Sequence, residues 1–296
     1  MKLGMIGLGA MGAPIAHHLN SGDELIAVSA INSEAFAEFA AIGIKASTDP
    51  KVVAEADIVL LCVPDGDVEK DVLFGAGALA AALRPGTLVV DLSTIVYQDA
   101  LEIGERLKTL SVDYLDCPIS GMKERAQSGT LTIMCGGDKA LFYRALPYLQ
   151  RFGSKVLHMG GPGSGQLMKM TNQLVYDTNI AALAEVMPMA VKMGLDPVLV
   201  SEVINTGTGR SHASEYFLPM ILEGRFDTSY TLGGAYKDLV SAARVSADHN
   251  IPMPVVSAMT SAYQAAIRAG HGRKDKGAMI LPFEEMNGVK VRKPGF

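Results

Sequence analysis

The amino-acid sequence predicts an α/β fold, in which a doubly wound parallel sheet is followed by an all-α C-terminal domain that begins with a long helix. Short apolar runs alternate with helical patterns over the first half of the chain, whereas the second half shows helical patterns alone. A glycine-rich segment, residues 160–165, separates the halves. Continuously apolar strands that alternate with helices are typical of a parallel sheet covered on both faces.

Each element of this fold can be placed from apolar runs and turn residues. The predicted strands, each bounded by Gly, Pro or Asp, are Leu3–Ile6, Leu25–Val28, Ile58–Val63, Thr87–Leu92 and Leu131–Cys135. The helices predicted between them are Met11–Leu19, Ser33–Ile42, Val52–Glu55, Val68–Leu83 and Gln98–Leu110. The predicted long helix is Gln166–Met193, with a bend expected at Pro188. The later helices are Pro197–Ile204, His212–Leu222, Ala235–His249, Val255–Ala269 and Ala278–Met286.

Length and composition limit what the protein can be. Its 296 residues are 49% hydrophobic and 19% charged, which provides a sizeable core and excludes a disordered chain. Lys and Arg number 26 against 31 Asp and Glu, so the net charge is −5. This acidic balance argues against binding to a nucleic-acid backbone.

The sequence predicts no metal site, disulfide or membrane span. Cys62, Cys117 and Cys135 are too scattered for a disulfide framework or a thiolate metal site, and we interpret them as reduced core residues. The six histidines show no ligand spacing. The stretch His249–Ile267, which lacks Asp, Glu, Lys and Arg, contains two prolines, whereas a span needs about 20 mainly apolar residues. We therefore expect a cytoplasmic protein.

A glycine-rich turn follows the first predicted strand. Residues 7–12 read Gly-Leu-Gly-Ala-Met-Gly, which is G-x-G-x-x-G at the start of a predicted helix. In such a turn the first glycine permits the tight bend, the second lets the backbone approach a pyrophosphate, and the third lets helix and strand pack closely. A plain βα turn is the alternative, but the place of the motif in an alternating βα pattern favours a Rossmann-type domain that binds NAD or NADP. The predicted contacts are Gly7, Gly9, Ala10, Met11 and Gly12.

The end of the second predicted strand should read the adenosine ribose. An Asp or Glu there indicates NAD, and a nearby Arg accommodates the phosphate of NADP. Ala30 and Ile31 occupy this place, and Asn32 and Ser33 follow them. Asn32 could hydrogen-bond a hydroxyl or a phosphate. Because no Arg or Lys is close in the sequence, the pattern favours NAD.

Four segments carry a resemblance to a known family. They are residues 7–12 (above), residues 116–121 (Asp-Cys-Pro-Ile-Ser-Gly), residues 160–173 (Gly-x-x-Gly-x-Gly-x-x-x-Lys-x-x-Asn-Gln) and residues 237–239 (Lys-Asp-Leu). In this order they resemble the β-hydroxyacid dehydrogenase family, which includes 3-hydroxyisobutyrate dehydrogenase and tartronate semialdehyde reductase. The resemblance covers nearly the whole chain. It implies a Rossmann-type domain over residues 1–161, a helical substrate and dimerisation domain over residues 162–296, and a homodimer or homotetramer.

The resemblance also implies an activity and the residues that perform it. The expected reaction is hydride transfer between a β-hydroxy acid, such as 3-hydroxyisobutyrate, and a nicotinamide cofactor, with Lys169 as the catalytic residue. Ser120 and Gly121 are expected to hold the substrate carboxylate, and Asn172 and Gln173 to line the same pocket. The positions that match cofactor contacts in the family are Val63, Pro64, Thr94 and Lys237.

The residues themselves support the role of Lys169. On a helix, Lys169, Asn172, Gln173 and Tyr176 fall on one face and form a polar stripe. Oxidation of an alcohol needs a group that accepts the hydroxyl proton, and burial can lower the pKa of a lysine from about 10.4 towards neutrality. A solvated helix lysine is the alternative. The glycine-rich approach and the Asn-Gln pair favour catalysis.

The segment around Ser120 resembles a strand end followed by a turn. Ligands of open parallel sheets bind beyond the carboxyl ends of strands, so the Ser120 hydroxyl and nearby N–H groups could hold a carboxylate; a simple turn is the alternative. In the family a second glycine usually follows Gly121, but here the residue is Met122. Its side chain is expected to contact the substrate, and either to crowd the pocket or to reshape it for an apolar substituent.

Two other functions compete with this one. The first is a reductase of another carbonyl, such as a semialdehyde or a sulfonated or larger hydroxy acid, or of an imine, on the same scaffold. Imine reductases of similar architecture lack the lysine at position 169, and 6-phosphogluconate dehydrogenase has a glutamate where this chain has Tyr176. The second is a non-catalytic nucleotide-binding module, which the combination of Lys169, Asn172 and Ser120 disfavours.

Overall fold

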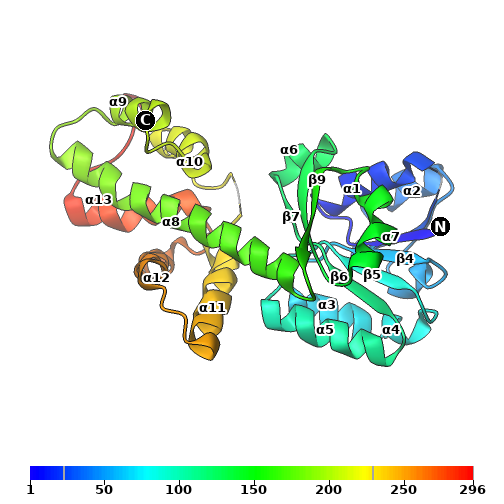
Figure 1. Cartoon of the computed structure of the whole chain (residues 1–296). Coiled ribbons are helices and arrows are strands. Elements are labelled where there is room, and N and C mark those ends of the chain that lie inside the picture. Colours follow the sequence, from blue (N-terminus) through cyan, green and yellow to red (C-terminus); the bar gives the residue numbers. More distant parts are fainter. Residues whose placement is uncertain (23, 229, 296) are drawn as a thin grey trace. The chain divides into compact units, whose positions relative to one another are not determined.

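The chain forms two compact units, which are described separately. The computed structural model describes residues 1–22, 24–228 and 230–295. The first unit is Met1–Lys169 and the second is Met170–Phe296, so that the boundary lies within the long helix α8 (Ser164–Lys192). Figure 1 shows the order of the elements along the chain.

The first unit is built on one mixed, mostly parallel sheet. Its order is β3-β2-β1-β4-β5-β6-β8-β7, and β9 pairs with β8. All pairs from β3 to β6 are parallel, whereas β8 runs antiparallel to β6 and β7. The strands are β1 (Leu3–Ile6), β2 (Leu25–Ser29), β3 (Lys45–Ser47), β4 (Ile58–Leu61), β5 (Leu88–Asp91), β6 (Asp113–Asp116), β7 (Ile119–Ser120), β8 (Leu131–Gly136) and β9 (Gly153–Gly160). The predicted Rossmann-type fold is confirmed, with two strands, β8 and β9, that run antiparallel to β1–β6.

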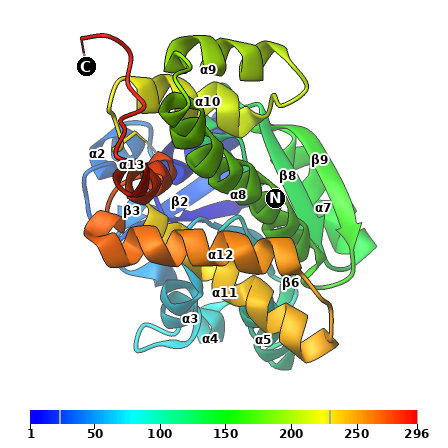
Figure 2. The same ribbon diagram turned by 90° about the vertical axis from the view of Figure 1, so that its left-hand side faces the viewer.

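Helices cover both faces of this sheet. They are α1 (Gly12–Leu19), α2 (Phe36–Ala41), α3 (Gly66–Phe74), α4 (Leu79–Ala82), α5 (Tyr97–Thr109), α6 (Met122–Gln127) and α7 (Lys139–Leu149). Successive strand residues point to opposite faces, so Leu3 and Met5 join a core cluster with Ile15 of α1, while Val59 and Leu61 join a separate cluster. Helix α7 lies against β8 and β9 (Figure 2).

Several predicted elements differ from those observed. The predicted helix Val68–Leu83 is divided into α3 and α4, because α3 ends at Gly75 and Ala78 adopts a positive φ of 22°. Predicted helix Val52–Glu55 is a 3₁₀ turn, Pro50–Val53, capped by Asp49. Strands β3 and β9 and helices α6 and α7 were not predicted as elements, and of β6 and β7 the sequence predicted only a strand end within residues 116–121.

The second unit is helical. Beyond α8, its α-helices are α9 (Pro197–Thr206), α10 (His212–Leu222), α11 (Leu232–His249), α12 (Pro254–Ala266) and α13 (Leu281–Asn287). Helix α8 continues through Pro188. By length and composition alone α8 could cross a membrane, and half of its most apolar window is buried inside the fold.

Candidate functional site

The glycine turn after β1 has the geometry that the dinucleotide motif predicts. Gly7 has a φ of +89°, and a Cβ there would lie 2.1 Å from the carbonyl oxygen of Cys62. A Cβ on Gly12 would lie 1.9 Å from the carbonyl oxygen of Gly7. A Cβ on Gly9, by contrast, would meet nothing within 4 Å. Close packing therefore explains Gly7 and Gly12, whereas Gly9 leaves backbone open to a ligand.

The first turn of α1 suits an anion. Met11 precedes the helix without a side-chain capping bond, and the first turn contains no acidic residue. The helix N-terminus thus carries N–H groups and a positive dipole end with no carboxylate competing for them. The residues of this turn therefore fit the pyrophosphate of a dinucleotide.

The other predicted cofactor residues of the first unit follow β2, β4 and β5. Ile31 is 98% exposed and Asn32 is exposed beyond the end of β2. Val63 and Thr94 are half-buried, and Pro64 is exposed, after β4 and β5. The backbone N–H of Val63 donates to the Ser93 hydroxyl over 3.0 Å, which ties the two loops together. Since β1, β2, β4 and β5 are parallel, these segments lie along one carboxyl edge of the sheet.

The segment Ser120-Gly121-Met122 follows β7. Strands β6 and β7 both run antiparallel to β8, so Ser120 ends its strand at the same edge as the cofactor turn. Gly121 has a φ of +141° and Met122 a φ of +60°. Met122 therefore adopts the left-handed backbone that favours glycine.

Buried carboxylates anchor the start of α8 to this edge. Asp116, at the end of β6, accepts hydrogen bonds from the backbone N–H groups of Gly163 (2.8 Å) and Gln166 (2.9 Å). The Gln166 side chain donates to Asp91 Oδ2 (3.1 Å) and to the Ser93 carbonyl (2.9 Å), and accepts from the Ile95 N–H (3.2 Å).

The glycines before Lys169 permit this anchoring. A Cβ on Gly165 would lie 2.3 Å from the Asp116 carbonyl oxygen and 2.4 Å from that of Met134. A Cβ on Gly163 would lie 2.6 Å from the Tyr97 ring. The glycine-rich segment thus allows the first turn of α8 to touch the sheet.

Lys169 lies three residues after Gln166 and is only 9% exposed. It is the last residue of the first unit. Asn172 is exposed and Gln173 half-buried, and they follow on α8 at helix spacings of three and four. Lys237, on α11 in the second unit, is half-buried.

Burial raises the pKa values of the acids beneath this edge. Desolvation raises the pKa of Asp91 to about 7 and that of Asp116 to about 6, although hydrogen bonds to both carboxylates oppose the shift. Sequence reasoning missed Asp91, Gln166 and Glu69, a fully buried residue of α3. The signals that could have found them are an acid within an apolar run and an amide at the start of an apolar helix.

The second unit contains a buried ion pair. The Lys276 ammonium lies 2.5 Å from Asp177 Oδ1 on α8, and both side chains are almost fully buried. The same ammonium lies 5.1 Å from the ring centre of Tyr176. The ion pair therefore lies beside Tyr176, the last residue of the predicted polar stripe.

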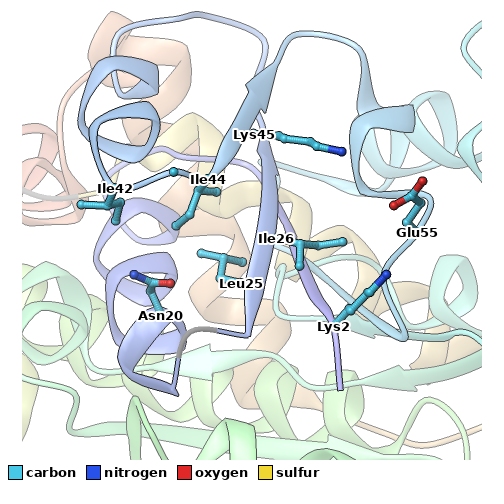
Figure 3. Close-up of a pocket in the computed structure, with 9 residues that line it drawn as sticks. Lys2, Asn20, Leu25, Ile26, Ile42, Ile44, Lys45 and Glu55 are labelled. Atoms are coloured by element: carbon cyan, nitrogen blue, oxygen red, sulfur yellow. The ribbon is translucent and has the colours of Figure 1, made fainter.

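Neither of two hollows lined by described residues contains a predicted site residue. The first, about 380 Å³, is shown in Figure 3. Lys2, Leu25 and Lys45 line it at the amino ends of β1, β2 and β3, which is the edge opposite the glycine turn. The second, about 420 Å³, lies beside α13. In the described parts of the chain, no group of three or more His, Cys, Asp and Glu residues could hold a metal ion.

Comparison with known proteins identifies the family. A family model described as the NAD-binding domain of 6-phosphogluconate dehydrogenase matches residues 2–161. A second, described as the NAD-binding of NADP-dependent 3-hydroxyisobutyrate dehydrogenase, matches residues 163–283. The chain belongs to the β-hydroxyacid dehydrogenase family. It is an NAD(P)-dependent oxidoreductase that acts on CH–OH groups.

Relatives of this hydroxyacid dehydrogenase differ in substrate. The chain is 33% identical to 2-(hydroxymethyl)glutarate dehydrogenase of Eubacterium barkeri, over 98% of this chain and 97% of that protein. It is 31% identical to 2-hydroxy-3-oxopropionate reductase of Escherichia coli, over 98% of this chain and all of that protein. The crystal structure of 3-hydroxyisobutyrate dehydrogenase from Salmonella typhimurium matches with a TM-score of 0.85 and 28% identity, over 95% of this chain and 99% of that one.

Proposed function

We propose that the protein transfers a hydride reversibly between a small β-hydroxy acid of the 3-hydroxyisobutyrate type and NAD, with Lys169 as the general acid and base. The observation that carries this proposal is the anchoring of Lys169. Its helix begins with Gly163 and Gln166 bonded to Asp116, and with the Gln166 side chain bonded to Asp91. This network holds a mostly buried lysine just beyond the carboxyl edge of the sheet, where α/β proteins bind their ligands.

Each predicted residue has a task in this reaction. Bound nicotinamide accepts or supplies the hydride. The Lys169 amine takes the hydroxyl proton during oxidation and returns it during reduction. The Ser120 hydroxyl and the N–H groups around Gly121 orient the substrate carboxylate, and the amides of Asn172 and Gln173 line the same pocket. A mostly buried Lys169 also excludes water from the proton transfer.

Cofactor binding is assigned to residues 1–161, and substrate binding and dimerisation to residues 162–296. The backbone of Gly7, Gly9, Ala10, Met11 and Gly12 holds the pyrophosphate, and Asn32 the ribose. The remaining cofactor contacts are Val63, Pro64, Thr94 and Lys237. A homodimer or homotetramer in the cytoplasm remains our prediction.

A second candidate is a larger hydroxy acid or semialdehyde on the same scaffold. Met122 favours it, because a bulky side chain stands in a left-handed position of the substrate segment. The name of the Eubacterium barkeri relative indicates that some members act on larger acids. Substrate size therefore needs a direct test.

The test is a panel of β-hydroxy acids of increasing size, each assayed with NAD and with NADP by nicotinamide absorbance. We expect turnover of a small acid with NAD as the better cofactor. Preferential turnover of a larger acid would replace the first candidate with the second. Saturable cofactor binding without turnover of any acid would contradict both candidates and favour a nucleotide-binding module.

A further inference from the structure

Glu69 is a fully buried acid, and the Tyr114 hydroxyl that faces it donates to Asp91. It lies on α3, its side chain is 0% exposed, and neither carboxyl oxygen has a hydrogen-bond partner among the described residues. An ionised carboxylate that is removed from water without donors is strongly destabilising. The protein must therefore either neutralise this group or accept a large loss of stability.

The groups that face Glu69 either accept hydrogen bonds or already donate theirs to another acid. Asp91 faces it from β5, Tyr114 from β6 and Asp99 from α5. The Tyr114 hydroxyl donates to Asp91 Oδ2 over 3.2 Å. The Lys70 ammonium, the nearby cation of α3, binds Asp99 at 2.6 Å and Glu102 at 2.8 Å. Glu69 thus faces carboxylates, to which only a protonated Glu69 could donate.

Of the acceptors that face Glu69, Asp91 also holds two neighbouring segments in place through hydrogen bonds. Its Oδ1 accepts from the Ser93 N–H (2.7 Å) and its Oδ2 from the Gln166 amide (3.1 Å). The Ser93 hydroxyl in turn accepts a hydrogen bond from the Val63 N–H. Asp91 therefore connects the loops after β4 and β5 with the start of α8, and an ionised Glu69 beside it would push this carboxylate away.

We propose that Glu69 carries a proton in the folded protein and donates a hydrogen bond to Asp91. Glu69 thereby acts as a positioning residue for the cofactor loops and the Lys169 helix. The positioning part rests on the function proposed above, but the protonation part does not. Burial, and then the neighbouring Asp91 charge, raise the pKa of Glu69 well above its usual range.

The pH dependence follows from the direction of this shift. The folded pKa of Glu69 lies well above the ordinary value of a glutamate, and that of Asp91 is raised to about 7. The stability that depends on the shared proton is thus complete below the unfolded values and is lost as the pH rises through the folded values. We expect the thermal midpoint to fall as the pH is raised from about 5 to 8.

The first experiment tests protonation in the whole protein. Infrared spectra at pH 6 should show a weaker carbonyl band of protonated carboxylic acid in Glu69→Gln than in wild type. The intensity lost should be that of one acid, because Asp91 and Asp116, with pKa values of about 7 and 6, contribute to the band in both proteins. The fall of the thermal midpoint between pH 5 and 8 should be less than half as large in Glu69→Gln. Glu55→Gln, which changes an exposed glutamate, should match wild type in both measurements. Equal bands and superimposable pH profiles in Glu69→Gln and wild type would overturn the proposal.

The second experiment tests positioning. Glu69→Gln keeps a donor for Asp91, whereas Glu69→Leu removes it at similar volume. We expect Glu69→Leu to weaken cofactor binding by about tenfold, equivalent to the loss of one hydrogen bond to a charged group, and Glu69→Gln to restore it to within about twofold. If Glu69→Leu remains folded and binds cofactor like wild type, Glu69 is not a positioning residue. If wild type binds no cofactor, the proposed function fails, while the infrared band still tests protonation.

Discussion

Substitution of Gly9 by alanine separates cofactor binding from folding. A Cβ at this position meets nothing within 4 Å, and Gly9 has no positive φ. The free energy of unfolding should therefore change by no more than about 0.5 kcal/mol. The added methyl instead occupies the open face of the turn, where a pyrophosphate would approach the backbone.

The expected loss of affinity follows from one displaced contact. A charge-assisted hydrogen bond contributes about 1.5–3 kcal/mol, so Gly9→Ala should raise the cofactor dissociation constant by about 10- to 150-fold. Gly12→Ala is the matched comparison, because its Cβ would lie 1.9 Å from the Gly7 carbonyl oxygen. That variant should destabilise the fold by about 1–3 kcal/mol or more.

Two measurements on each variant decide the outcome. Urea unfolding gives the stability, and titration with NAD and NADP gives the dissociation constants. Wild-type affinity in a stable Gly9→Ala would refute the inference that the pyrophosphate lies against this turn. Severe destabilisation by Gly9→Ala would show that the open face of Gly9 is filled by the protein itself.

Two further predictions concern the substrate segment and the helical unit. Met122→Gly should raise the free energy of unfolding in urea by about 0.5–1 kcal/mol. The left-handed backbone costs a non-glycine residue about 1–2 kcal/mol, and the greater chain entropy of glycine in the unfolded state offsets about 0.5–1 kcal/mol of the gain. A loss of stability would contradict this strain. Lys276→Met should cost about 3–5 kcal/mol by leaving Asp177 buried and unpaired. The double variant with Asp177→Asn should recover most of that loss, and equal stability of the single and double variants would count against the pair.

The sequence predicted the strands whose side chains are buried on both faces. Strands β1, β4 and β5 are apolar runs because helices cover both sides of them. Strand β9 was missed because most of its side chains are partly or fully exposed, and its sequence includes Lys155 and His158. Only the end of strand β6 was predicted, because Asp113 and Asp116 flank only two residues, and the second acid is needed to anchor α8.

The site was predictable where its signal is local. The glycine turn (residues 7–12) and the polar stripe of α8 (residues 169–176) are each short, continuous segments, so residue spacing alone indicates them. The anchoring network is not local, since Gln166 and Asp91 are 75 residues apart in the sequence. The proximity of Glu69 to Asp91 likewise depends on α3 packing against the sheet, which no sequence period encodes.

The central claim is that Lys169 transfers the proton, and one variant tests it most directly. Lys169→Ala should bind cofactor with an affinity within about twofold of wild type and remain equally stable, while kcat on the preferred hydroxy acid falls by at least about 100-fold. Lys192→Ala, an exposed lysine on the same helix, is the control and should keep full turnover. Near-normal kcat in Lys169→Ala would contradict the account.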